Sequence, residues 1–308
     1  LLCKYTNVYM IIRFFKSTKF PQIITSLITS FLIMLAFKDV NNLASEFYSL
    51  SFLIAIFFLS LFIISKNSIL KNNQYIALGL IIFCGIYFKM PSNISTTSSC
   101  FFLLLSIRKI YSLNSNKKQN KKLFDIGFWF LISTILNPIN LIFIITILSG
   151  VFIFHKITVE VIFKILTGVM AAALLIFFFH DLTANTSNSL DFIPYTIDYI
   201  WLIYNSKVMH LSSDYRHWLF ASICIVTFFY YLFRFFGNST SERLKNLFLL
   251  IFFINSILLV FLINEYSIFL FFPFLVTLIK IISEIRSNLF FEIAILIIII
   301  LNSYPYNF

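Results

Sequence analysis

The feature that most constrains this chain is a series of eleven strongly apolar runs separated by short polar breaks. The runs cover residues 21–37, 50–65, 74–89, 95–107, 124–136, 139–154, 161–179, 217–233, 246–263, 268–283 and 288–302. Their apolar residues are continuous rather than alternating, which favours helices over the strands of a membrane barrel. An upright span needs about 20 residues, so the shorter runs draw on flanking Ser, Thr, Asn and Tyr. We predict an all-α polytopic membrane bundle with about 11 transmembrane helices.

Composition excludes a soluble globular protein. Of the 308 residues, 60% are hydrophobic and 11% are charged, and the mean hydropathy is +0.95. Soluble domains contain about 45–50% apolar and about 25% charged residues, so this chain has too few polar side chains for a water-facing surface. The six glycines form no Gly-x-Gly and no P-loop pattern, which excludes the usual nucleotide-binding motifs.

The distribution of basic residues predicts the topology. A net charge of +11 is compatible with nucleic-acid binding or with loops that face the cytoplasm. With the N-terminus inside, 19 of the 23 Lys and Arg residues fall on inner segments, and the outer ones are Lys38, Lys89, Lys207 and Arg216. This asymmetry follows the positive-inside rule and removes the nucleic-acid interpretation.

The same pattern divides the chain into three parts. We expect a cytoplasmic N-terminal segment at 1–20, a single transmembrane domain at 21–302 with a long outer loop at 180–216, and an outer tail at 303–308. The runs at 124–136 and 139–154 meet at Asn137-Pro138-Ile139-Asn140, which is compatible with two spans or with one re-entrant hairpin; we favour two spans.

Local patterns predict three features of packing and charge. The small-residue patch Thr167–Ala173 is the most favourable site for a close helix–helix contact. Asp125 is expected to pair with Lys121 or Lys122. The basic loop Arg108–Lys122 is interpreted as a solvated topology determinant, with binding of anionic lipid headgroups or of a cytoplasmic partner as alternatives.

The candidate functional residues lie on the predicted outer side, which holds seven of the twelve acidic residues and three of the four histidines. Asp39, just outside the first run, is a candidate general base. If the entry to the next helix is helical, the side chains of His210, Asp214 and His217 share one face beside Arg216, and the guanidinium suits a phosphate. We predict catalysis by Asp39 and substrate binding by His210, Asp214, Arg216 and His217, with no metal and no cofactor.

Three stretches carry a resemblance to a known family: Met10-Ile-Ile-Arg13-Phe-Phe-Lys16-Ser-Thr-Lys19, the segment from Arg108-Lys109 to Lys121-Lys122-Leu-Phe-Asp125-Ile-Gly127-Phe-Trp129, and Phe271-Phe272-Pro273. They resemble an uncharacterised family of polytopic inner-membrane proteins of Bacteroidota, over essentially the whole chain from Met10. The resemblance implies a bacterial inner-membrane location and brings no catalytic residues.

A weaker, architectural resemblance is to glycosyltransferases that use polyprenyl-phosphate sugars, in which an acidic residue occupies the first outer loop, as Asp39 does. Polysaccharide polymerases offer a related likeness through Arg216 and His217. The first hypothesis is action on a lipid-linked or cell-envelope glycan, with the bilayer and a polyprenyl-phosphate-linked substrate as partners. The alternatives are a structural subunit with a membrane-protein partner and, third, a transporter.

Overall fold

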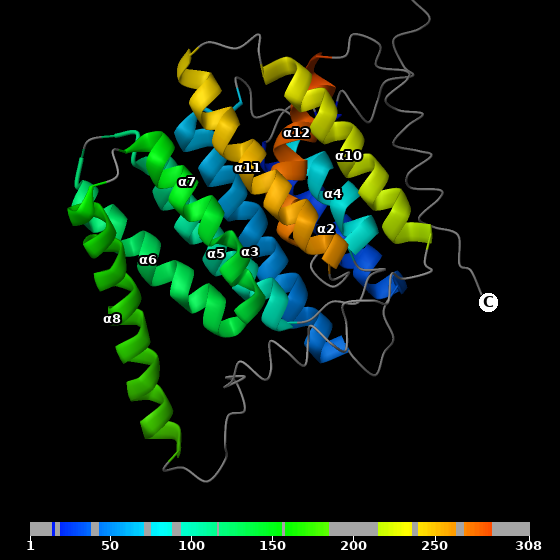
Figure 1. The fold of residues 1–308 in the computed structure, drawn as a ribbon. Helices are drawn as coiled ribbons and strands as arrows, with labels where there is room; N and C mark the ends of the chain where they lie inside the picture. Colours follow the sequence, from blue (N-terminus) through cyan, green and yellow to red (C-terminus); the bar gives the residue numbers. More distant parts are fainter. Residues whose placement is uncertain are drawn as a thin grey trace, which may run out of the picture.

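In a computed structural model, the described residues are 14–15, 19–37, 43–70, 75–87, 94–115, 117–155, 158–184, 215–235, 240–262 and 268–284. The regular elements in these ranges are all helical (Figure 1). They are α2 (Phe20–Phe37), α3 (Leu43–Asn67), α4 (Ile76–Tyr87), α5 (Ile94–Ser112), α6 (Gln119–Leu136), the 3₁₀ helix η3 (Pro138–Phe143), α7 (Ile144–Phe154), α8 (Val159–Ala184), α10 (Tyr215–Phe235), α11 (Thr240–Leu262) and α12 (Phe271–Glu284).

Ten of the eleven apolar runs therefore coincide with helices, and the run at 288–302 lies outside the described residues. Three helical segments are long and apolar enough to cross a membrane: Phe47–Asn67, Val159–Phe178 and Glu242–Val260. Shorter apolar helices accompany them. The all-α prediction is confirmed for the described residues, and the helices are those of a multi-pass membrane protein. The number of eleven spans stays a prediction.

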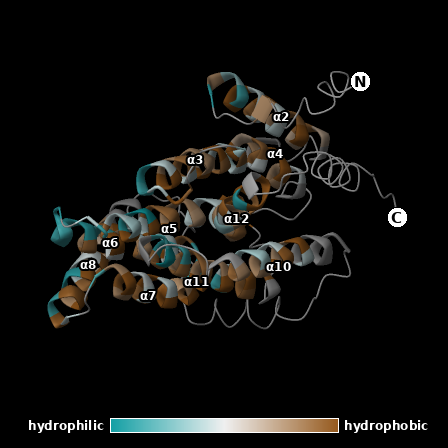
Figure 2. Ribbon diagram, turned by 90° about the horizontal axis from the view of Figure 1, so that it is seen from above, coloured by the Kyte–Doolittle hydropathy of each residue, from teal (hydrophilic) through white to brown (hydrophobic). Residues whose placement is uncertain are grey.

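The helices pack side by side in a bundle whose bodies are hydrophobic and whose hydrophilic residues gather mainly at helix ends (Figure 2). In one series of neighbours, α3 packs on α5, α5 on α6, and α6 on α8. In another series, α7 packs on α11 and α11 on α10. Helix α12 contacts α4, α10 and α11, and α2 lies against α4. Helix α12 therefore lies inside a framework formed by the other helices.

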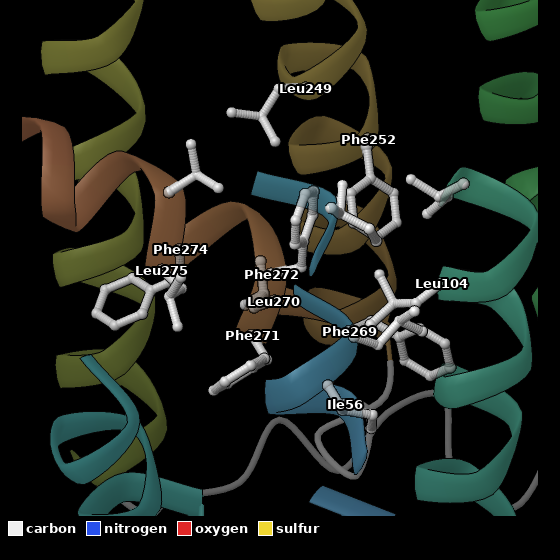
Figure 3. Close-up of a cluster of buried hydrophobic side chains, with 14 of the residues drawn as sticks. Ile56, Leu104, Leu249, Phe252, Phe269, Leu270, Phe271, Phe272, Phe274 and Leu275 are labelled. Carbon is white, nitrogen blue, oxygen red and sulfur yellow. The ribbon is translucent and has the colours of Figure 1, made fainter. Parts of the chain in front are cut away.

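The core of the bundle is built around the beginning of α12. Residues 268–270 form a 3₁₀ turn directly before α12, and every residue from 268 to 279 is buried, so this segment meets protein on all sides. Its aromatic side chains pack against several other helices, with ring centroids 5.3 Å apart for Phe269 and Phe143 and 4.8 Å apart for Phe271 and Phe83. Figure 3 shows this cluster, in which Ile56, Leu104 and Phe252 converge on the α12 residues from other elements.

The segment that joins α6 to α7 forms a tight turn. Asn137 is extended, with φ −151°, and its side-chain oxygen accepts a hydrogen bond from the Ile139 amide. Pro138 begins the 3₁₀ helix, since its fixed φ suits a first helical position where no amide donor is needed. The chain then turns back along the bundle as α7 (Figure 1). The structure therefore has two helices joined by a tight turn, an arrangement that two spans and a re-entrant hairpin share, and the choice of two spans stays a prediction.

Helices α6 and α8 cross at two glycines. A Cβ atom placed on Gly127 would lie 2.1 Å from the Ile165 carbonyl oxygen, and one on Gly168 would lie 2.0 Å from the Phe124 carbonyl oxygen. Each backbone therefore occupies the space that a side chain of the other helix would need. This confirms the predicted close contact of the Thr167–Ala173 patch and identifies Gly127 as its partner.

Candidate functional site

The residues predicted to form the outer site lie largely outside the described part of the chain. Asp39, His210 and Asp214 are outside it. Arg216 and His217 belong to the first turn of α10, where only the backbone is described. The convergence of Asp39 with the 210–217 segment therefore stays a prediction, as does the shape of the long loop, of which residues 185–214 lie outside the described ranges.

One end of the bundle carries several described basic residues of the predicted inner segments, and we call it the basic end: Lys66, Arg108, Lys109, Lys122, Lys245 and Lys280. The Lys245 ammonium donates a hydrogen bond to the Asn67 carbonyl oxygen over 2.5 Å, which ties the beginning of α11 to the end of α3. The Tyr231 hydroxyl donates to Asn246 Oδ1, and Lys280 lies 4.8 Å from the centre of the Tyr231 ring. Contacts between segments far apart in the sequence thus hold helix ends together at the basic end.

The opposite end of the bundle carries the helix ends that flank the predicted site residues. From Tyr231, at the basic end, α10 extends back about 24 Å to Tyr215 at 1.5 Å per residue. The beginning of α2 is anchored through Gln22, which donates to the Phe14 carbonyl oxygen, beside the Phe15–Tyr75 backbone hydrogen bond. Gly79 of α4 approaches Leu275, whereas Phe83 approaches Phe271, so α4 begins on the side of Lys280 and ends away from the basic end. Because Tyr75 directly precedes α4, α2 also begins on the side of the basic end. The end of α2, next to residue 38, and the beginning of α10 therefore lie at the opposite end of the bundle.

Helix α8 follows the same polarity. Lys164, in its second turn, donates to Asn120 Oδ1 over 2.8 Å and also pairs with Glu160. Asn120 is in the first turn of α6, at the basic end. The last residue of α8 lies about 30 Å further along the helix, which is the end from which the long loop continues. Figure 1 shows α8 ending and α10 beginning away from the basic end.

Asp125 has a different partner from the one predicted. Its Oδ2 lies 2.5 Å from the Lys109 ammonium on α5, whereas Lys122 donates to the Ser112 and Ser115 carbonyl oxygens over 2.6 and 2.8 Å and Lys121 is exposed. The prediction of a pair with Lys121 or Lys122 was wrong. The reason is the antiparallel packing of α5 and α6, which brings Lys109 to Asp125 while Lys122 satisfies carbonyls left open at the end of α5.

Sequence reasoning missed a buried polar seam where α5, α6 and η3 meet. The Ser133 hydroxyl donates to the Ser99 carbonyl oxygen over 2.8 Å, and Asn140 Nδ2 donates to Ser133 Oγ over 2.7 Å and to the Ser133 carbonyl oxygen over 3.2 Å. Ser95 Oγ donates to the Leu136 carbonyl oxygen. Asn140 is fully buried, and its Oδ1 has no hydrogen-bond partner among the residues that the structure describes. The run Ser95–Ser99, five consecutive hydroxyl residues at the start of an apolar segment, was the signal available in the sequence.

The polar groups buried within the described residues are uncharged. They are hydroxyls and carboxamides, and several bond across helices, as Asn255 does to the Thr146 hydroxyl over 2.6 Å. Among the described residues no group of three or more His, Cys, Asp or Glu side chains is arranged for a metal ion. Such interior groups chiefly fix how the helices pack, because an unpaired polar group is costly away from water.

No protein-family model, no curated protein and no solved structure matches this chain.

Proposed function

We propose that this protein resides in a bacterial inner membrane and acts on a lipid-linked or cell-envelope glycan at the outer face, as a membrane glycosyltransferase or polysaccharide polymerase does. Asp39 is the general base in this proposal. His210, Asp214, Arg216 and His217 bind the substrate, with Arg216 and the histidines on a phosphate of a polyprenyl-phosphate-linked donor. The proposal includes membership of the Bacteroidota inner-membrane family that the sequence resembles.

The observation that supports this proposal is the common position of two helix ends. The end of α2 precedes Asp39 by two residues, the beginning of α10 carries Arg216 and His217, and both helix ends lie opposite the basic end. A phosphate of a membrane lipid lies at headgroup level, where a guanidinium binds it through two parallel hydrogen bonds. A base that acts on the same lipid has to reach that level from the same side.

The experiment is complementation of a deletion strain followed by measurement of the sugar composition of the cell envelope. We expect Asp39→Asn to lower glycan production by at least about 100-fold, because general bases contribute about 10²–10⁴-fold to rates. Arg216→Gln is expected to fail as well, and Arg216→Lys to recover part of the function through its remaining charge.

The matched control is Lys38→Gln, which changes one charge in the same short connection and leaves the proposed base in place. Protein level in the membrane is measured for each variant. Full envelope-glycan composition in Asp39→Asn and Arg216→Gln cells, at normal protein level, would exclude the proposed function.

The alternative function is that of a structural subunit, and one observation favours it. Only 17% of the span Val159–Phe178 in α8 is buried, against 50% and 56% for the spans in α3 and α11. Its exposed apolar residues include Phe163, Met170 and Leu174. A photocrosslinking amino acid at position 174 distinguishes the two cases: crosslinks to one protein in stoichiometric amount support a subunit, and crosslinks to lipid alone exclude a partner at this helix.

A further inference from the structure

At the basic end, two cations share one aromatic ring. The guanidinium of Arg108, on α5, lies 4.2 Å from the centre of the Phe62 ring, and the Lys66 ammonium lies 5.3 Å from the same centre. Phe62 and Lys66 belong to α3, so the arrangement joins two neighbouring helices. Cations stack on aromatic faces because of the ring quadrupole, and here one exposed ring brings two positive charges together.

Further positive charge surrounds this pair. Burial and the neighbouring charges of Lys109 and Lys66 lower the pKa of the Lys122 ammonium from its ordinary value. The acidic group in this cluster is Asp125, which is bonded to Lys109. Four cations thus face one carboxylate in this part of the structure. Lys122 donates hydrogen bonds to the Ser112 and Ser115 oxygens, and Lys109 donates one to Asp125. Arg108 and Lys66 have no hydrogen bond or ion pair within the described residues.

The surface that continues from the two cations is apolar. Phe58, Phe62 and Lys66 are spaced by four residues along α3, so they follow one another on one face. Phe58 is 46% exposed and Phe62 is 37% exposed, so both rings lie on the outer surface of the bundle. Along this surface, aromatic rings are followed by two cations over about two helical turns. A phospholipid changes from apolar acyl chains to a charged headgroup over a similar distance, so its polarity is complementary to that of this surface.

We propose that Lys66 and Arg108 bind the phosphate of an anionic phospholipid from the leaflet at the basic end, with its acyl chains along Phe58 and Phe62. The guanidinium donates to two phosphate oxygens, Lys66 supplies a second charge, and Lys109 and Lys122 add to the local positive potential. The binding energy comes from charge at the interface and from apolar contact below it. A free phosphate would make only the charged contacts, without those of the acyl chains, so it would bind more weakly.

The experiment is native mass spectrometry of the full chain in detergent, with phosphatidylglycerol, phosphatidylcholine or inorganic phosphate added in turn. We expect phosphatidylglycerol to bind about tenfold more tightly than phosphatidylcholine, and phosphate alone not to displace it at equal concentration. Lys66→Gln is expected to weaken phosphatidylglycerol binding about fivefold, and the pair Lys66→Gln with Arg108→Gln about 30-fold, from the usual contribution of each cation at an anionic surface.

Two further variants keep the test decisive. Lys121→Gln removes one charge from an exposed side chain next to Lys122 and is expected to leave the affinity for phosphatidylglycerol within twofold of the unmodified protein. Arg108→Lys keeps the charge and is expected to retain most of the binding, which separates the loss of a cation from a loss of folding.

Three results would overturn the proposal. The first is equal affinity for the two lipids, and the second is displacement of phosphatidylglycerol by inorganic phosphate at equal concentration. The third is a loss of affinity in Lys121→Gln as large as that in Lys66→Gln, because binding would then follow net charge rather than this site.

Discussion

The contact of α6 with α8 gives the sharpest prediction of stability. Gly168→Ala adds a methyl group whose carbon would lie 2.0 Å from the Phe124 carbonyl oxygen, 2.9 Å from the Phe124 carbonyl carbon and 3.0 Å from the Phe128 nitrogen. All three atoms are backbone, so no side chain can turn aside, and the helices have to separate by more than about 1 Å to reach ordinary van der Waals distance. Overpacking of this kind costs about 1–3 kcal/mol.

Two smaller terms modify this value. At Gly127 and at Gly168 the Cα–H bond that a Cβ would replace points at a carbonyl oxygen of the other helix, so separation also weakens two Cα–H···O contacts, each worth about 0.5–1 kcal/mol. Alanine gains about 1 kcal/mol over glycine in helix propensity, which acts in the opposite direction. We therefore expect a net destabilisation of about 1–4 kcal/mol, concentrated at the α6–α8 contact.

The assay has a global and a local measurement. The free energy of unfolding is measured by denaturant titration of the full chain in mixed micelles. The local measurement is the rate at which a bifunctional thiol reagent joins cysteines introduced at positions 120 and 164, since the native Lys164 side chain reaches across from α8 to Asn120 on α6. We expect this crosslink to form readily in the unmodified background and to form slowly, or not at all, with Gly168→Ala.

Gly85→Ala is the matched control, because a Cβ atom at Gly85 would meet no atom within 4 Å. It is expected to leave the rate of the 120–164 crosslink unchanged and to be neutral or to stabilise the protein by up to about 1 kcal/mol. Equal effects of Gly85→Ala and Gly168→Ala on both measurements would refute the reasoning, since the loss would then not depend on the crossing.

Three further predictions concern polar contacts and a second glycine. Ser133→Ala, which removes the donor to Ser99 and an acceptor for Asn140, is expected to lower the free energy of unfolding by about 0.5–2 kcal/mol, measured in the same titration. Asp125→Asn is expected to cost no more than about 1 kcal/mol, because its pair with Lys109 is partly open to solvent; a loss above 3 kcal/mol would mean a buried ion pair. Gly150→Ala is expected to cost less than Gly168→Ala, because its new methyl group would meet the side chains of Phe248 and Ile110 rather than backbone.

The sequence was sufficient for the helices themselves. Continuous apolar runs leave the backbone no partner except its own carbonyls in a bilayer, so each run predicts a helix, and ten of the eleven lie in described helices. Gly168 was predictable for a related reason: small residues allow the close backbone approach that membrane helices use for association. The residues of the predicted outer site are a different case, because Asp39, His210 and Asp214 lie outside the described ranges and their convergence stays a prediction.

Only the tertiary structure showed which polar side chains of different helices are partners. Asp125 has lysines within four residues in the sequence, yet its partner is Lys109, because helix packing sets which long side chains meet. The seam from Ser99 through Ser133 to Asn140 joins three elements, and no local pattern specifies that their hydroxyl and amide groups meet.

The surroundings of each apolar helix were decided by the tertiary structure alone. The spans in α8 and α11 are both strongly apolar, yet 17% of one and 56% of the other is buried in the bundle, and residues 268–279 are buried on every side. Lipid tails are as apolar as leucine, so a hydrophobic residue gains the same transfer from water whether it then meets lipid or protein. Hydropathy therefore determined that these segments leave water, and only packing, through shape and close contact, decided which of them form the core.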